Sequence, residues 1–167
     1  MNDLDTPVLT IDLVDYRDPE DGAALVMLLD AYACDPMGGG EPLTDEVRDL
    51  LPRRLAEVAG AFSLIARLDD RPVGLANCFT LFSTFAAEPL INVHDVAVLP
   101  QHRGMGIARA LMARIEDEAV ERGACKVTLE VLSGNLPAKS LYSDLGYSDY
   151  VLDPKVGQAL FWQKKLK

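Results

Sequence analysis

The sequence predicts a mixed α/β domain in which a β-sheet is flanked by helices, with residues 1–167 forming one domain. The length of 167 residues falls within the usual range of a single domain. Hydrophobic residues make up 49% and charged residues 25% of the chain, close to the average of soluble globular proteins. Segments with strand-like patterns also interleave with segments of helical spacing. The expected order of elements is therefore β-α-α-β-β-β-α-β-α-β-β.

In the first part of the chain, strand-like segments rich in apolar residues predict four strands, at residues 8–14, 62–67, 73–81 and 90–98. Asp18-Pro19 has the form of an N-cap followed by proline at the first helical position, and it predicts a helix that runs to about Ala33. Thr44 starts a second predicted helix, which Pro52 is expected to interrupt or end. The glycine-rich stretch 35–40 is expected to be a flexible loop.

The second part of the chain contains the clearest helical pattern. Ile107, Leu111 and Ile115 recur every four residues, and Gly123 is a suitable C-terminal stop. The other predicted elements are a strand at 126–132, a helix at 137–145 closed by Gly146, and a terminal hairpin of strands at 147–152 and 159–165. The edge of that hairpin could join two copies of the chain as a homodimer.

The charge balance and the cysteines exclude several classes of protein. With 16 basic and 26 acidic residues, the formal net charge is −10, opposite to that of a protein that binds nucleic-acid phosphates. A positively charged partner is favoured instead. The apolar block 23–29 is too short to span a bilayer, and the acidic N-terminus lacks the pattern of a signal peptide. Three widely spaced cysteines argue against a disulfide framework or a metal site and suit a reducing cytoplasm.

The segment from Val96 to Ala108 predicts an anion site. A strand enters it, a short loop carries Gly104 and Gly106, and an amphipathic helix leaves it. Backbone N–H groups and the helix dipole converge at such a point, and glycines permit the close approach of a phosphate. The Gly-Lys-Ser/Thr of a nucleotide-binding P-loop is missing, and residue 109 is arginine where a dinucleotide fingerprint requires glycine. An ordinary strand–helix turn remains the alternative interpretation.

Three spaced motifs resemble one enzyme family. Arg103-x-x-Gly106-x-Ala108 fits a Q/R-x-x-G-x-G/A signature. Downstream stand Leu129-Glu130-Val131-x-x-x-Asn135 and Ala138-x-x-Leu141-Tyr142-x-x-x-Gly146-Tyr147. Together these motifs are similar to those of the GNAT superfamily of N-acetyltransferases, most nearly the bacterial ribosomal-protein N-terminal acetyltransferases, although the motifs are shared across many substrates.

The resemblance implies acetyl-CoA as co-substrate, no metal, and a role for each motif residue. The residues expected to contact the coenzyme are Val96, Ala97, Val98, Arg103, Gly104, Met105, Gly106, Ile107, Ala108, Arg109 and Asn135. Of these, Val96 to Val98 would offer main-chain groups to the pantetheine and the acetyl carbonyl, and Gly104 to Arg109 would hold the pyrophosphate. Tyr142 would protonate the departing thiolate, and Glu130 would accept the amine proton through water. General chemistry agrees, because an alkylamine with a pKa near ~10.4 needs a base.

Each of these roles has a competing interpretation. Glu130 shares strand parity with polar neighbours and could be solvated, whereas Asp95 is a competing base. By parity Asp95 would lie among Ile91, Val93 and Ala97 as a buried carboxylate, and His94 is a third candidate. Tyr142 could be a core aromatic residue. Asn135 could be a turn or cap residue.

The sequence gives less information about the site that binds the acceptor amine. Asp95, Phe82 and Phe85 are its candidate residues, and the glycine-rich stretch 38–40 could form a mobile lid. The predicted function is direct acetyl transfer from acetyl-CoA to a primary amine of a cationic small molecule. The alternatives are acetylation of protein N-termini or lysines, a catalytically silent coenzyme-A-binding sensor, and a nucleotide-phosphate-binding protein.

Overall fold

The computed structural model describes residues 7–150, 153, 155, 157 and 159–166. In chain order its elements are β1 (Leu9–Leu13), α1 (Pro19–Ala33), α2 (Asp45–Glu57), β2 (Ala61–Leu68), β3 (Arg71–Ser83), β4 (Glu88–Val98), the 3-10 helix η1 (Pro100–His102), α3 (Ile107–Glu121), β5 (Val127–Leu129) and α4 (Leu136–Asp144). The chain forms two compact units, Met1–Glu130 and Val131–Lys167.

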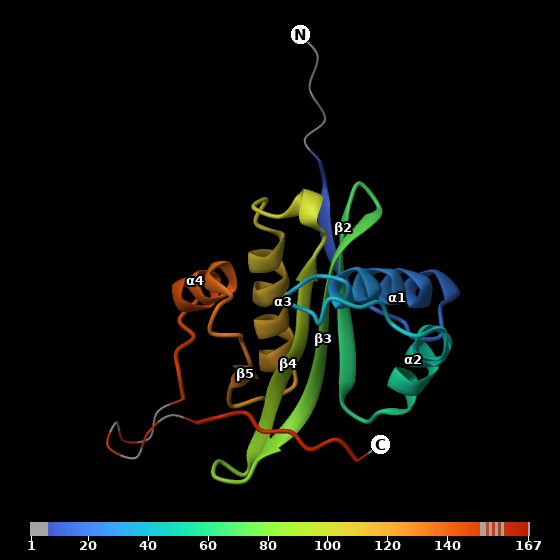
Figure 1. Ribbon diagram of the computed structural model, residues 1–167. Coiled ribbons are helices and arrows are strands. Elements are labelled where there is room, and N and C mark those ends of the chain that lie inside the picture. Colours follow the sequence, from blue (N-terminus) through green and yellow to red (C-terminus); the bar gives the residue numbers. More distant parts are fainter. Residues whose placement is uncertain (1–6, 151–152, 154, 156, 158, 167) are drawn as a thin grey trace. The chain divides into compact units, whose positions relative to one another are not determined.

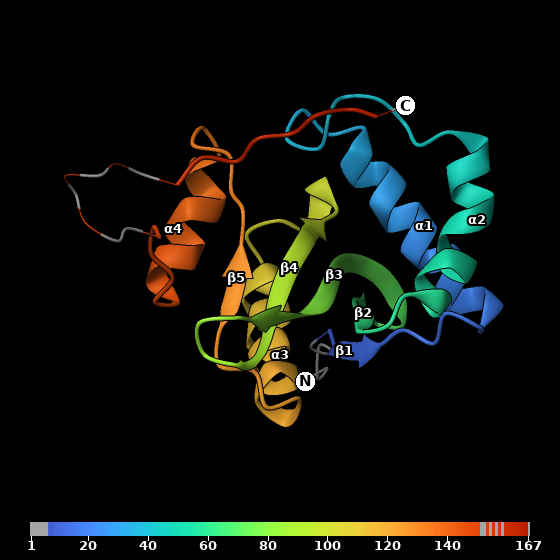
Figure 2. The same cartoon turned by 90° about the horizontal axis from the view of Figure 1, so that it is seen from below.

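The first unit is a five-stranded mixed sheet with helices on both faces, which confirms the predicted fold class. The strand order is β1-β2-β3-β4-β5; the first three pairings are antiparallel and β4 pairs with β5 in parallel. Helix α3 covers one face, and α1 and α2 lie on the other (Figures 1 and 2). On the face of α1 and α2, a buried core is formed by Leu25, Leu28, Leu55, Ile65 and Leu75.

Helix α3 carries the apolar stripe that the sequence predicts. Ile107, Leu111 and Ile115 are each at most 2% exposed, as is Met112 beside them. A Cβ atom built on Gly74 of β3 would lie 3.2 Å from the Ile107 and Leu111 side chains. The small residue in the strand therefore lets the first turns of α3 pack closely on the sheet.

The caps of α1 and α2 follow the sequence, but the end of α2 does not. The Asp18 side chain accepts hydrogen bonds from two N–H groups of the first turn of α1, and Thr44 accepts one from Val47. The prediction that Pro52 interrupts or ends α2 is wrong, because the helix continues to Glu57. The Pro52 ring packs on α1 opposite Gly22, and Leu55 is buried in the next turn. Tertiary packing thus offsets the local cost of the proline.

A β-bulge in β4 changes which side chains share a face. Asn77 of β3 pairs with Asp95, but the next residue, Cys78, pairs with Val93, so His94 is an extra residue in β4. Side-chain parity reverses across such a bulge. Asp95 therefore shares the face of Asn77, whereas Val93 shares the opposite face with Cys78. The expectation that Asp95 lies among the side chains of Ile91 and Val93 is wrong for this reason.

Strand β5 is shorter than predicted. It spans Val127–Leu129 instead of 126–132, and its last pair is Val93 with Leu129. The bulge at His94 follows this pair immediately. Because a bulge bends its strand and disrupts the ladder, the pairing of β4 with β5 ends there.

The second unit contains α4, which begins after the N-cap Asn135 and ends before Gly146, whose φ of +91° suits glycine. The predicted terminal hairpin is not formed in the described residues, since 147–150 and 159–166 contain no strand. Residues 151, 152, 154, 156 and 158 of that prediction lie outside the described residues. Alternating apolar residues give a segment a strand-like pattern but do not supply a neighbouring strand to pair with. The homodimer expected from this hairpin therefore loses its support.

Candidate functional site

The site is built around the part of β4 that β5 does not pair. After Val93, β4 continues to Val98 in a ladder with β3, whereas the described pairing with β5 has ended. Main-chain N–H and C=O groups on the outer edge of residues 94–98 are therefore open to a ligand, except the Val98 oxygen, which accepts a hydrogen bond from Arg103. These residues include Val96, Ala97 and Val98, which the sequence assigns to coenzyme contact.

The loop after β4 has the geometry of an anion site. Gly104 and Gly106 have φ values of +77° and +79°, in the left-handed region that favours glycine. A Cβ atom on either glycine would meet no described protein atom within 4 Å, so the space beside both is open. Gly106 is the N-cap of α3 and has no side chain to accept a hydrogen bond from the first turn. The unpaired N–H groups of the first turn and the positive end of the helix dipole lie beside this open space.

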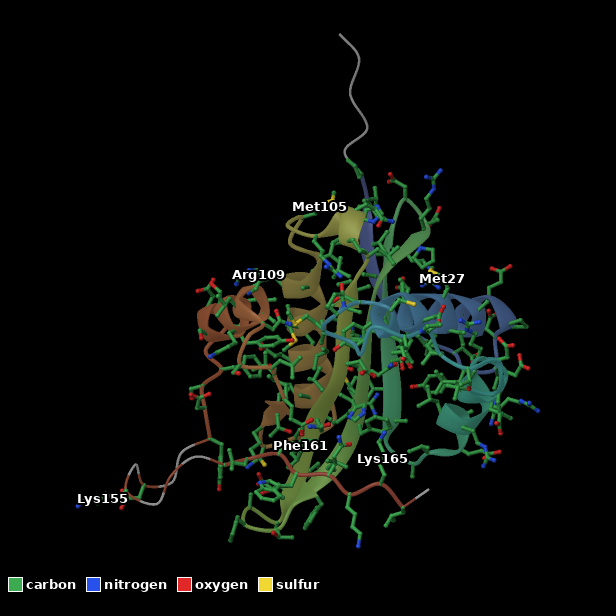
Figure 3. The ribbon with its side chains drawn as sticks, viewed as in Figure 1. Met27, Met105, Arg109, Lys155, Phe161 and Lys165 are labelled. Carbon is green, nitrogen blue, oxygen red and sulfur yellow. The ribbon has the colours of Figure 1, made fainter. Side chains whose placement is uncertain are left out.

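Two long side chains stand in this loop and in the helix turn that follows it. Met105 is 53% exposed in the loop, and Arg109 stands in the first turn of α3 (Figure 3). Two left-handed glycines followed by an open helix N-terminus fit a diphosphate group chemically. The residues from Gly104 to Arg109 therefore fit the pyrophosphate of coenzyme A.

The Arg103 side chain makes two hydrogen bonds within the protein, and its predicted coenzyme contact stays a prediction. Its Nε donates to the main-chain oxygen of Val98 at 3.1 Å, and its Nη2 donates to Asp35 Oδ2 at 2.7 Å. The bond from Arg103, followed by one from the N–H of Met37, lowers the pKa of Asp35 below its usual value. The side chain of Arg103 thus ties the end of β4 to the loop between α1 and α2.

The loop from Asp35 to Gly40 forms a hydrogen-bonded turn. The main-chain oxygen of Asp35 accepts hydrogen bonds from the N–H groups of Gly38, Gly39 and Gly40. A Cβ atom on Gly38 would come within 1.9 Å of the Tyr32 main-chain oxygen. The glycines therefore permit a tight hydrogen-bonded turn against α1, and the predicted flexibility of this loop stays a prediction.

Asp95 lies at the open edge of β4, on the face that carries α1. Its Oδ2 accepts a hydrogen bond of 3.0 Å from Nδ2 of Asn77, which is only 4% exposed. Tyr32 of α1 is close enough for the charge of the Asp95 carboxylate to affect its pKa. Burial, followed by the negative charges of Asp95 and Asp35, raises the pKa of Tyr32.

Glu130 follows the last residue of β5, and its side chain is exposed. Two residues earlier, Thr128 accepts a hydrogen bond from Asn92 at 3.3 Å. Asn92 pairs with Phe79, which packs against the core on the α1 face. Glu130 therefore follows the strand beside the polar pair Asn92 and Thr128, on the same face of the sheet as Asp95. Its role as a base stays a prediction.

Asn135 and Tyr142 both lie in the second unit. The Asn135 side chain accepts a hydrogen bond from the N–H of Ala138 at 3.3 Å, so it caps α4. The half-buried Tyr142 ring lies 6.1 Å from the ring of Tyr147, at an angle of 60°. Capping uses only the amide oxygen of Asn135, and its two N–H donors remain compatible with the predicted coenzyme contact.

Phe82 and Phe85 lie at the other end of the β3–β4 hairpin from Val98. They are 62% and 98% exposed, and Phe82 pairs with Pro89. Pro89 is separated from Asp95 by roughly 20 Å of strand at about 3.3 Å per residue. The structure therefore does not gather the three predicted acceptor residues at one point.

Within the described residues, neither the hollow between α1 and α2 nor the metal-ligating side chains add a residue to this site. A hollow of about 560 Å³ between α1 and α2 is lined by Arg17, Asp49 and Arg53 among others, and by no residue of β4 or the glycine loop. In the part of the chain that the structure describes, no group of three or more His, Cys, Asp or Glu side chains could hold a metal ion. No helix within the described ranges has the length and apolar character needed to cross a membrane.

The profile of the acetyltransferase (GNAT) family matches residues 25–147, which include the β4 edge, the glycine loop and α4. The chain belongs to the GNAT acetyltransferase family. Streptothricin acetyltransferase from Streptomyces lavendulae is 39% identical over 80 residues, 48% of this chain and 42% of that protein. Thialysine N-epsilon-acetyltransferase from Mus musculus is 31% identical over 77 residues, 46% of this chain and 45% of that protein.

A solved GNAT-fold structure extends the likeness over most of the chain. The ribosomal-protein-alanine N-acetyltransferase from Brucella melitensis biovar Abortus 2308 is 27% identical, with a TM-score of 0.66 over 87% of this chain and 99% of that one. In contrast, the chain spans less than half of the length of the two curated relatives that it matches. GNAT family enzymes use acetyl-CoA, and the glycine loop fits that coenzyme.

Sequence reasoning missed the polar side chains that surround Asp95 and Arg103. Asn77 and Ser63 are at most 4% exposed in strands that are mostly apolar, and Asp35 anchors a loop far away in the sequence. A polar residue inside an apolar strand is itself informative, because a buried polar group needs a partner. The sequence does not say which partner it finds.

Proposed function

We propose that residues 1–167 form one acetyl-CoA-dependent N-acetyltransferase domain that transfers an acetyl group directly to a primary amine. The observation that carries the proposal is the unpaired edge of β4 leading into two left-handed glycines and the open N-terminus of α3. An edge strand suits an amide-containing arm, and a helix N-terminus suits a diphosphate. Coenzyme A contains both groups.

Main-chain groups of Val96, Ala97 and Val98 bind the pantetheine arm and polarise the acetyl carbonyl, as an oxyanion hole does. The N–H groups from Gly104 to Arg109 hold the pyrophosphate. Arg103 contributes by fixing the end of β4 through Val98. Asn135 donates its amide protons to the coenzyme arm.

In the transfer step the neutral amine nitrogen attacks the thioester carbonyl carbon, a C–N bond forms and the C–S bond breaks. The amine proton leaves to a carboxylate, and the thiolate takes a proton from Tyr142. Glu130 accepts the amine proton through water, since its exposed position beside the end of β5 leaves room for one. Asp95 is the competing carboxylate.

The proposed acceptor is a cationic small molecule. The net charge is −10, and Asp95 and Asp35 both act on Tyr32 near the open edge of β4. Relatives named for streptothricin and thialysine support a small amine. If charge steers the acceptor, its kcat/KM falls as salt shortens the screening length to about 8 Å at physiological ionic strength.

Acetylation of a protein N-terminus is the second candidate, and its support is the likeness to a ribosomal-protein-alanine N-acetyltransferase. A thiol-release assay with acetyl-CoA separates the candidates. The panel contains streptothricin, thialysine, polyamines, aminoglycosides, free amino acids and N-terminal peptides. Release with a cationic small amine supports the proposal, and release only with peptides favours the second candidate. Coenzyme binding without release from any amine identifies a silent coenzyme-A sensor and refutes both.

A further inference from the structure

A row of four polar side chains crosses the sheet beneath α1. It consists of Tyr16 before α1, Ser63 in β2, Asn77 in β3 and Asp95 in β4. Ser63 pairs directly with Asn77, and Asn77 with Asp95, so the row runs perpendicular to the strands. Ser63 and Asn77 are only 1% and 4% exposed. Buried polar groups in a sheet must be hydrogen-bonded, and here they bond to one another.

All the hydrogen bonds of this row point in one direction. Nδ2 of Asn77 donates to Oδ2 of Asp95 at 3.0 Å, and Oγ of Ser63 donates to Oδ1 of Asn77 at 2.6 Å. The hydroxyl of Tyr16 lies 2.8 Å from Oγ of Ser63. Because Ser63 has already given its one proton to Asn77, Tyr16 must be the donor. The row is therefore a chain of donors that ends on a carboxylate, in which each bond polarises the next.

The chain fixes the orientation of the Asn77 amide. If the amide were turned over, its oxygen would face Oδ2 of Asp95 with no proton between the two acceptors. Asn77 therefore holds Asp95 through Oδ2. Within the described part of the chain, no side chain donates a hydrogen bond to Oδ1 of Asp95, at the edge of β4 where β5 has separated.

A merely structural role explains this arrangement poorly. Replacing both partners of a buried hydrogen bond by apolar groups of the same shape is often neutral or stabilising. On the same face of the sheet, the next pair of side chains, Ile65 and Leu75, is fully buried and apolar. The chain of donors ends, moreover, one residue before Val96, where the proposed coenzyme contacts begin.

We propose that Asn77 is a positioning residue that holds the Asp95 carboxylate so that Oδ1 receives an N–H of the acceptor amine. Ser63 and Tyr16 keep the Asn77 amide in the required orientation. This inference rests on the proposed acetyl transfer and deepens it, since it assigns the acceptor a cationic or strongly donating amino group beside the thioester. Asp95 touches the acceptor, whereas Asn77 acts through Asp95.

The test is a double-mutant cycle on kcat/KM for the best amine of the thiol-release panel. Asn77→Leu removes the amide at similar volume and is expected to lower kcat/KM roughly 10- to 150-fold, the effect of one hydrogen bond to a charged group. In an Asp95→Asn background the same substitution should cost less than about threefold. Ser63→Ala should lower kcat/KM less than Asn77→Leu does, and Tyr16→Phe should lower it less than Ser63→Ala does. The KM for acetyl-CoA should stay unchanged in all of them.

Thr80→Val is the matched control, because Thr80 also lies in β3 and its buried Oγ1 has no hydrogen-bond partner among the described residues. It should leave kcat/KM within twofold of wild type. Where turnover is too low, calorimetric affinity of the same amine for the coenzyme-A-bound variants replaces kcat/KM in the cycle. The Asn77 side-chain amide resonance, measured without substrate, should shift on Asp95→Asn and on Ser63→Ala.

Penalties of Asn77→Leu and Asp95→Asn that simply multiply would overturn the positioning role, as would an Asn77 amide resonance insensitive to both substitutions. A lower Tm with unchanged kcat/KM of the folded Asn77→Leu protein would show a structural role instead. Failure of the wild-type protein to acetylate any amine would overturn the proposed function. That outcome is recognisable separately, because the amide resonance reports the hydrogen-bond chain without turnover.

Discussion

Gly106→Val tests the assignment of the glycine loop to the pyrophosphate. Gly106 has a φ of +79° and caps α3, and a Cβ atom there would project into space empty of described protein atoms. A valine therefore clashes with a bound phosphate and not with the protein. Loss of one charge-assisted hydrogen bond costs about 1.5–3 kcal/mol. That is roughly a 10- to 150-fold increase in the Kd for acetyl-CoA.

The control is Gly123→Val, beyond the other end of the same helix. Gly123 has a φ of +65°, and a Cβ atom there would also meet no described atom within 4 Å. Both variants should therefore lose similar stability, at about 1–2 kcal/mol for a left-handed residue with a side chain. Isothermal calorimetry with acetyl-CoA should give weaker binding for Gly106→Val alone. Equal Kd values for the two folded variants would refute the assignment.

Three further predictions use other parts of the molecule. Tyr142→Phe should lower kcat about 10²–10⁴-fold with acetyl-CoA affinity unchanged, in steady-state kinetics and calorimetry on one preparation; a loss of Tm with kcat intact would contradict the acid role. Asp35→Asn should lower Tm near pH 7, because the pKa of Asp35 is lowered in the folded protein by Arg103. This stabilisation is present above the unfolded pKa of about 3.9 and is lost as pH falls through the folded value, so the Tm difference from wild type should disappear at low pH. Burial raises the pKa of Cys78 to about 12, so thiol titration at neutral pH should detect the two exposed cysteines in the native protein and the third only after denaturation; rapid native labelling of Cys78 would refute its burial.

Features that depend on neighbouring residues could be predicted from the sequence. The caps Asp18 and Thr44 and the buried stripe of α3 appear where the pattern places them. Gly104 and Gly106 both adopt the left-handed backbone that only glycine adopts readily. The loop motif was recognisable because its function depends on main-chain geometry over a few residues, and local sequence largely determines that geometry.

Features that depend on pairing between distant segments were decided by the tertiary structure. The bulge at His94 follows from the register of β4 against β3, and no local pattern marks an extra residue in a strand. It reverses the face of Asp95 and ends the ladder with β5. Packing of α2 on α1 carries the helix past Pro52, against local propensity. The sequence therefore specifies which residues are available for chemistry. The register of the sheet decides which of them meet, because cross-strand neighbours are set by hydrogen bonds between strands that are remote in the chain.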